Sequence, residues 1–134
     1  MNKYDQKIKF SNNFRDEEKA LEKAGIKTWG LLNELPEKDL STIIAGNRSS
    51  LKRLTHLKII SSFVCEMSLL PNEAALLLYS GIPSIKSLSS ISPQDLVIKT
   101  GRMQRQLNSN IDQTIDLKKA NYLIKAAILR QKNK

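Results

Sequence analysis

The sequence predicts an all-α protein in which two tandem copies of a small helical module form one compact unit of about eight helices. Apolar residues recur mostly at spacings of three and four, and no alternating stretch is long enough to predict a strand. One pattern also occurs twice at a constant offset of 56 residues, which indicates a repeated supersecondary unit. The matched residues are Leu21, Gly25, Ile26, Leu32, Asp39 and Leu40, which recur as Leu77, Gly81, Ile82, Leu88, Asp95 and Leu96.

The first copy is expected to follow a polar leader at residues 1–13 and to cover residues 14–68. Its first helix should begin near Phe14 and end at Gly25, because glycine tolerates the left-handed conformation that closes many helices. Thr28 is suited to cap a short second helix, and residues 36–39 should start a third short helix that runs through Ile44. A longer amphipathic helix over residues 49–67 then completes this copy.

The second copy is expected over residues 69–134 and should repeat the same order of helices. Gly81 should end its first helix, and Ser84 should cap its second. Ser92 precedes a proline at the first helical position, which is a strong start signal for the third helix. A loop is predicted at residues 108–113, and Thr114 is predicted to cap the last helix.

The net charge of +9 is unevenly distributed along the chain. Residues 1–45 contain eight Lys or Arg and eight Asp or Glu, whereas residues 46–134 contain fourteen basic and five acidic residues. An excess of this kind favours binding to a polyanion. The C-terminal two thirds of the chain are therefore expected to bind the partner.

The composition indicates a soluble cytoplasmic protein. No stretch approaches the roughly 20 apolar residues of a membrane span, and residues 1–10 lack the apolar run of a signal peptide. The single cysteine, Cys65, excludes an intrachain disulfide and is expected to be a buried, unreactive thiol. No membrane association is therefore expected.

The repeated order of a helix, Gly-Ile-x-Thr/Ser, a short helix and Asp-Leu resembles the helix-hairpin-helix superfamily. It is more closely similar to the bacterial and plastid family called domain of unknown function 4332, over roughly residues 14–130. The motifs that carry this resemblance are residues 24–28 with Asp39-Leu40, and residues 80–84 with residues 92–96. Modules of this superfamily serve in DNA repair enzymes, in polymerases and in structural protein contacts, so the resemblance implies a fold and leaves the function open.

One departure from the superfamily pattern affects the expected mode of binding. DNA-binding members carry a Gly-hydrophobic-Gly hairpin before the helix that corresponds to residues 14–24 or 72–79, and its backbone N–H groups hold a phosphate. Here the hairpin positions read Phe-Arg-Asp-Glu at residues 14–17 and Leu-Pro-Asn-Glu at residues 70–73. The glycines are missing and acids are present, so this binding mode is not expected.

Enzymatic chemistry is not expected, and neither is a cofactor or a metal ion. His56 has no partner at a spacing that suggests a catalytic triad, and His56 with Cys65 supplies only two of the ligands that a zinc site needs. Asp39 and Asp95 occupy equivalent positions near helix starts, which a helix-capping role explains without a catalytic one. Trp29 matches an inward position of the repeat and is expected in the core.

Two basic segments are the candidate binding sites, each beside a glycine expected to break a helix and at roughly corresponding places in the two copies. The candidate anion-binding residues are Arg48, Lys52, Arg53, Arg102 and Arg105. Arginine and hydroxyl groups near a helix N-terminus suit a phosphate or a carboxylate. Other lysines, such as Lys58, Lys118 and Lys125, are expected to extend the field.

Two functions remain open from the sequence. The first is a non-enzymatic protein that binds DNA or RNA phosphates without sequence preference; about four neutralised phosphates would give a slope near −3.6 for log affinity against log salt. The second is an adaptor or assembly module whose basic half binds an acidic protein partner. An ordinary solvated face would also account for the basic segments.

Overall fold

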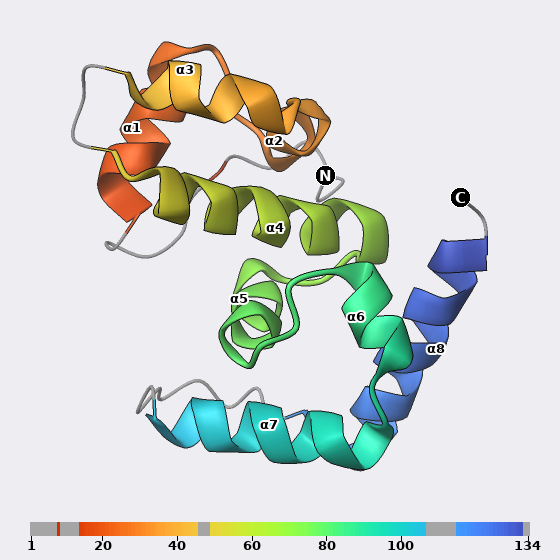
Figure 1. Ribbon diagram of the computed structural model, residues 1–134. Helices are drawn as coiled ribbons and strands as arrows, with labels where there is room; N and C mark the ends of the chain where they lie inside the picture. The colour runs from red at the N-terminus through yellow and green to blue at the C-terminus, as the bar shows by residue number, and fades with distance from the viewer. Residues whose placement is uncertain (1–7, 9–13, 46–48, 107–114, 133–134) are drawn as a thin grey trace. The chain divides into compact units, whose positions relative to one another are not determined.

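The computed structural model describes residues 8, 14–45, 49–106 and 115–132. Across these residues the chain forms eight α-helices and one short 3-10 helix, and no β-strand (Figure 1). The all-α prediction is confirmed. No helix in these ranges is both long enough and apolar enough to cross a membrane.

The chain divides into two compact units, residues 1–71 and residues 72–134. The helices of the first unit are α1 (Arg15–Lys23), α2 (Trp29–Glu34), the 3-10 helix η3 (Glu37–Asp39), α3 (Leu40–Ile44) and α4 (Leu51–Met67). In this unit α4 packs against both α2 and α3, and α1 packs against α3. Its buried apolar side chains include Phe14, Leu21, Trp29, Leu32, Leu40, Leu54 and Leu57.

The second unit repeats the order of the α-helices and the packing of the last helix on the two α-helices before it. Its helices are α5 (Pro71–Tyr79), which begins at the boundary residue, α6 (Ile85–Ser90), α7 (Pro93–Gln106) and α8 (Leu117–Lys132). The bounds of α5 and α6 lie 56 residues after those of α1 and α2, as the sequence repeat predicts. Because α8 packs on α6 and α7 as α4 packs on α2 and α3, α8 is the counterpart of α4.

The glycines of the repeat end the first helix of each copy. Gly25 has a φ of +82°, its N–H donates to the Glu22 carbonyl (3.0 Å), and the N–H of Ile26 donates to the Leu21 carbonyl (2.9 Å). This pair of hydrogen bonds is the Schellman motif. The second copy forms the same motif, with Gly81 at a φ of +89°. The N–H of Gly81 donates to the Leu78 carbonyl (3.1 Å), and the N–H of Ile82 donates to the Leu77 carbonyl (3.0 Å).

Hydroxyl caps start the later helices where the sequence predicts them. The Thr28 hydroxyl accepts from the N–H of Leu31 (3.2 Å), and Ser84 accepts from Ser87 (3.0 Å). Ser92 accepts from the N–H of Asp95 at the start of α7 (3.1 Å). These bonds satisfy N–H groups that the first helical turn leaves without an internal acceptor.

Two predictions about the second copy have different outcomes: one lies outside the described residues and the other is wrong. Thr114 and the predicted loop at 108–113 lie outside the described residues, and the cap of α8 is Asp116, whose carboxylate accepts from the N–H of Lys119 (2.8 Å). The predicted break beside Gly101 is wrong, because α7 continues through it to Gln106. A glycine inside a helix costs only about 1 kcal/mol, and the buried Leu96 and Thr100 hold this helix in place.

Candidate functional site

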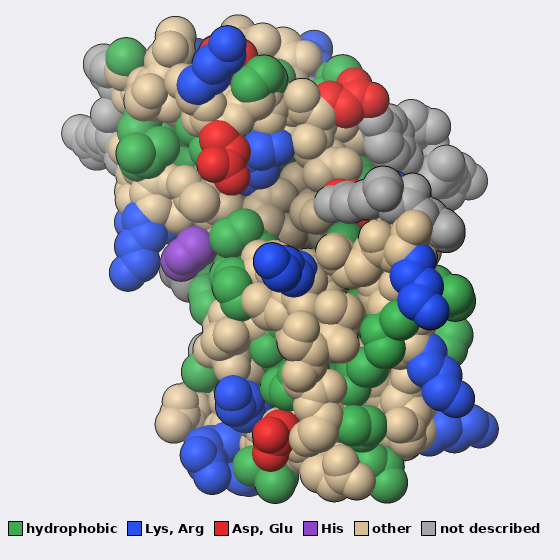
Figure 2. Space-filling view, turned by 45° about the vertical axis from the view of Figure 1, so that its right-hand side comes forward, with side chains coloured by type: hydrophobic (Ala, Val, Ile, Leu, Met, Phe, Trp, Pro, Cys, Tyr) green, Lys and Arg blue, Asp and Glu red, His purple; other side chains and the backbone are tan. Residues whose placement is uncertain are grey.

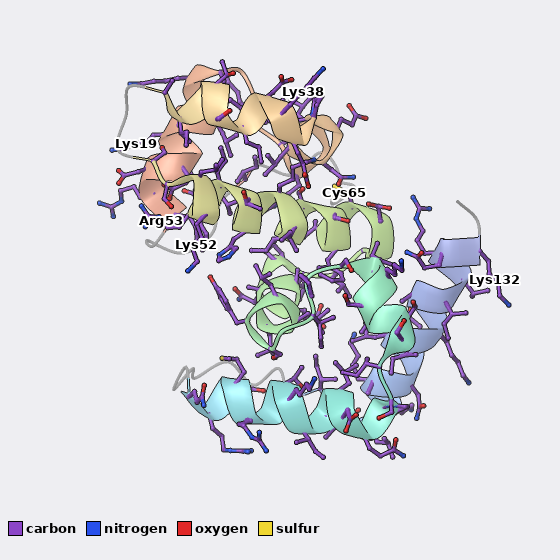
Figure 3. All side chains as sticks on the ribbon, viewed as in Figure 1. Lys19, Lys38, Lys52, Arg53, Cys65 and Lys132 are labelled. Atoms are coloured by element: carbon purple, nitrogen blue, oxygen red, sulfur yellow. The ribbon has the colours of Figure 1, made fainter. Side chains whose placement is uncertain are left out.

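The first predicted basic segment lies at the start of α4 (Figure 3). Arg48 falls outside the described residues. Lys52 is exposed in the first turn of α4. Arg53, the next residue, forms an ion pair with Glu17 of α1. Of the two predicted residues of this segment that the structure describes, Lys52 is exposed and Arg53 is engaged by a carboxylate of the chain.

Glu17 occupies the N-terminus of α4 with its carboxylate. Its side chain is fully buried, and one oxygen accepts from the Arg53 Nε at 2.9 Å. The other oxygen accepts from the backbone N–H of Ser50 at 2.7 Å. The Ser50 hydroxyl in turn caps the N–H of Arg53 (3.3 Å). Sequence reasoning identified a place for a phosphate or a carboxylate here, and the occupant is a carboxylate of the chain itself.

The second copy contains the equivalent ion pair. Glu73 lies 56 residues after Glu17, in the first turn of α5, and its carboxylate is 3.3 Å from the Lys119 Nζ in the first turn of α8. The structural counterpart of Lys52 and Arg53, at the start of α4, is therefore the start of α8. The prediction that the two basic segments, at the start of α4 and at the end of α7, occupy corresponding places in the two copies is wrong. The repeat of the two glutamates was the available sequence signal, but it did not identify their partners.

Lys58, expected to extend the basic field, instead caps a neighbouring helix. Its Nζ donates to the backbone carbonyls of Leu32 (3.3 Å) and Asn33 (3.0 Å) at the end of α2. A cation is favourable at this end of a helix because the last carbonyls carry partial negative charge. Burial lowers the pKa of Lys58, although Glu37 and Glu66 act in the opposite direction. Lys58 is therefore a structural residue of the first unit.

The second predicted basic segment remains exposed. Arg102 and Arg105 lie in the last turns of α7, with Lys99 beside them. The buried positions of α7 are Leu96 and Thr100, so both arginines follow the packed part of the helix. The Arg105 side chain lies against Gly101: a Cβ added at Gly101 would be 3.5 Å from a guanidinium nitrogen of Arg105. None of these three cations forms an ion pair with a described residue.

Burial shifts the pKa of both His56 and Cys65. Burial, followed by the nearby Lys52, lowers the pKa of His56. Cys65 is partly exposed, so the expected full burial of its side chain is wrong. Partial burial still raises the pKa of the Cys65 thiol to about 11, and Glu66 and Glu34 act in the same direction. In the described ranges, no group of three or more His, Cys, Asp or Glu side chains is arranged to hold a metal ion.

Trp29 and the two repeat aspartates are the other residues that the sequence singles out. Trp29 is 1% exposed, so its predicted place in the core is confirmed. Asp39 and Asp95 lie in the first turns of η3 and α7, where a negative charge is favourable. Asp39 also stands at the N-cap of α3, but its side chain makes no capping hydrogen bond there. A surface hollow in the first unit contains none of the predicted site residues and is lined by Ile8, Arg15, Glu18, Lys19, Glu22, Ile26 and Lys27.

Comparison with known proteins identifies a family. No curated protein and no solved structure gives a significant match to the chain. The family described as domain of unknown function (DUF4332) matches residues 11–129, which include all helices except the last residues of α8. The chain therefore belongs to the DUF4332 family.

Proposed function

We propose that this protein is a non-enzymatic cytoplasmic protein that binds nucleic-acid phosphates without reading base sequence, through the cations at the end of α7. The observation that carries the proposal is the exposure of Arg102 and Arg105, which have no acidic partner among the described residues. Lys99 adds a third cation on the same helix. Phosphate contacts of this kind supply affinity but carry no sequence information.

The charge of the second unit supports this proposal. Residues 72–134 contain ten Lys or Arg and four Asp or Glu. Two of the acids are already engaged, since Glu73 pairs with Lys119 and Asp116 caps α8. The lower half of Figure 2 accordingly presents many more basic than acidic side chains. A field of this sign attracts a polyanion.

We further infer that both copies are helix-hairpin-helix-like modules in which the phosphate-binding hairpin has been replaced. In the first copy, Phe14 precedes α1 as a buried side chain, and Glu17 turns its carboxylate toward α4. In the second copy, Pro71 begins α5 and has no N–H to donate. These substitutions favour a phosphate site elsewhere in the chain, and the end of α7 is the best candidate.

The test is fluorescence anisotropy of labelled duplex DNA, single-stranded DNA and RNA, titrated with the full-length protein between about 50 and 200 mM salt. Three phosphate contacts predict a slope near −2.7 for log affinity against log salt on duplex DNA. The double variant Arg102→Glu with Arg105→Glu should lose binding. The matched control reverses the exposed Lys19 and Lys38 of the first unit (Figure 3) and should bind as the parent does. Equal losses in both variants, or no binding at the lowest salt, would refute the proposal.

An adaptor role is the second candidate function. The observation in its favour is the exposed face of α8, where Tyr122 is 65% exposed and Leu129 is 61% exposed. Apolar side chains have no counterpart in a phosphate backbone, whereas a protein partner buries them.

A further inference from the structure

Five exposed side chains form a continuous stripe along α8. They follow one another at spacings of four, three, four and three residues: Lys118, Tyr122, Lys125, Leu129 and Lys132. At 3.6 residues per turn, this spacing places all five on one face of the helix. The opposite face holds the buried residues Ala120, Leu123, Ile124 and Ala127. The stripe therefore points away from the core of the second unit.

The apolar members of the α8 stripe are unusually exposed. Tyr122 and Leu129 have the highest exposed fractions of the large apolar side chains in the described ranges, 65% and 61%. A single exposed leucine needs no explanation. Here, however, two such residues share one face, and Leu117 (49%) and Ile128 (37%) lie along its flank. Such a cluster is typical of a contact surface.

The tandem repeat does not impose this stripe. Counted from the first residues of the two helices, Leu51 in α4 and Leu117 in α8, the counterparts of Lys125 and Leu129 in α4 are Ile59 and Phe63. Phe63 is buried, whereas Leu129 is exposed. The alternation of lysine with apolar residues is thus specific to the second copy.

The three lysines of the stripe are available to a partner. Lys118, Lys125 and Lys132 form no ion pair with a described residue. They recur every seven residues, so successive lysines are about 10 Å apart along the helix axis. The adjacent Lys119 is different: it pairs with Glu73, and its Nζ lies 5.7 Å from the centre of the Tyr122 ring. This contact helps to hold Tyr122 in place beside the lysine row.

We infer that the α8 stripe docks an acidic amphipathic α-helix of a protein partner, an inference that rests on the adaptor role as the second candidate function. A partner helix with a heptad pattern repeats its side chains at the same spacing of about 10 Å. One row of Glu or Asp would face the three lysines, and an adjacent apolar row would cover Tyr122 and Leu129. A contact between the α8 helices of two copies of this chain is disfavoured, because it would place lysine against lysine.

Nucleic acid satisfies only part of this surface. Phosphates would contact the lysines, and a base would stack on Tyr122, but Leu129 and the flanking Ile128 would gain little from either. Their exposure favours a partner that offers apolar side chains at regular intervals. We therefore assign a protein helix to the α8 stripe and nucleic-acid phosphates to the cations at the end of α7.

Two synthetic peptides test this inference by fluorescence anisotropy with the full-length protein. The first is a three-heptad helical peptide with glutamate at one heptad position and leucine at an adjacent one. The second has the same composition in an order that abolishes the heptad spacing. We expect the phased peptide to bind at least about tenfold more tightly than the scrambled peptide. Equal binding of the two peptides would mean that only net charge is recognised, and would overturn the inference.

Three variants complete the test. Lys118→Glu with Lys125→Glu and Lys132→Glu should abolish binding of the phased peptide. Tyr122→Ala with Leu129→Ala keeps the charge and should weaken binding by about tenfold or more. The control reverses three exposed lysines of the first unit, Lys19, Lys23 and Lys38, and should leave binding unchanged. All substituted side chains are exposed, and thermal melts confirm that each variant is folded.

Labelled single-stranded and duplex DNA in the same assay separate this inference from the nucleic-acid proposal. Selective binding of the phased peptide without DNA binding would refute the nucleic-acid proposal and support docking at α8. Loss of DNA binding in the α8 lysine variant, together with equal binding of both peptides, would place α8 in a nucleic-acid surface and refute the docking inference. An unchanged affinity for the phased peptide in the Tyr122 and Leu129 variant would also refute it.

Discussion

The carboxylate of Glu17 and the guanidinium of Arg53, 36 residues apart in the sequence, form an ion pair of 2.9 Å in the first unit. Glu17 is fully buried, whereas the Arg53 side chain is 42% exposed. The second oxygen of Glu17 also accepts the N–H of Ser50 (2.7 Å), which precedes α4. The start of α4 is thus attached to α1 by a charge that water does not reach.

Loss of Arg53 should destabilise the first unit more than loss of the charge on Glu17. In Arg53→Met, the carboxylate stays buried without its cation, which typically costs about 3–5 kcal/mol. In Glu17→Gln, an oxygen remains for the Ser50 N–H and water can solvate the partly exposed guanidinium, so a loss of about 1–3 kcal/mol is expected. Urea denaturation of both variants measures the two losses. A smaller loss for Arg53→Met than for Glu17→Gln would contradict this account of the pair.

The equivalent pair of the second copy provides the matched comparison. The side chains of Lys119 and Glu73 are 39% and 15% exposed, and their separation is longer, at 3.3 Å. An ion pair in contact with water contributes about 1 kcal/mol or less. Lys119→Met should therefore cost clearly less than Arg53→Met in the same urea experiment.

The sequence predicts the elements of this fold well because local chemistry determines most of them. Gly25 and Gly81 need the left-handed conformation, and Ser84 and Ser92 cap the helices that follow them. Gly101 is the exception, since the propensity of one glycine is too weak to end a helix that is packed on its neighbour. Local signals are therefore decisive at helix ends and weak inside helices.

The sequence predicts the candidate site less well, because it does not show whether a lysine or arginine side chain is paired with another group in the folded protein. Arg53 and Lys58 are engaged by groups brought near by packing, a glutamate in α1 and the carbonyls that end α2. Arg102 and Arg105 extend beyond the packed part of their helix. The spacing of the α8 stripe was visible in the sequence, but its exposure required the structure.

Alanine at either repeat glycine should destabilise the protein by a similar amount. Gly25 and Gly81 have φ values of +82° and +89°, and an added Cβ would meet no atom within 4 Å at either site. The cost is therefore that of the left-handed backbone alone, about 1–2 kcal/mol. Urea denaturation of Gly25→Ala and Gly81→Ala measures it. A loss near zero at either site would show that the turn relaxes.

Gly101→Ala is the control for these two variants and should have the opposite effect. Gly101 is helical, and its added Cβ would make an ordinary contact of 3.5 Å with Arg105. Alanine is favoured over glycine inside a helix by about 1 kcal/mol. The same denaturation experiment should give a higher midpoint for this variant than for the parent.

The thiol of Cys65 should react slowly at neutral pH. Its pKa is raised to about 11, so at pH 8 roughly one thiol in a thousand is ionised, and the thiolate is the reactive form. The reaction rate with an aromatic disulfide reagent should rise tenfold per pH unit up to about pH 11 and should be much faster in urea. Because the folded pKa lies above the unfolded value, stability is complete below the unfolded pKa and declines as the pH rises toward 11. A rate that levels off near pH 8 would contradict this prediction.

Lys58→Met should reduce stability and leave nucleic-acid binding unchanged. The Lys58 ammonium donates to two carbonyls at the end of α2, and hydrogen bonds from a charged group contribute about 1.5–3 kcal/mol. Burial lowers the pKa of Lys58, so desolvation offsets part of that gain and a net loss of about 1 kcal/mol is expected. DNA affinity in the anisotropy assay should stay within about twofold of the parent, because the Lys58 ammonium is already engaged by the carbonyls at the end of α2.

Arg102→Met, which removes an exposed cation, is the comparison and should decrease the magnitude of the salt slope by about one. If Lys58→Met lowered DNA affinity as much as Arg102→Met did, Lys58 would have to leave the carbonyls of α2 when the protein binds its partner.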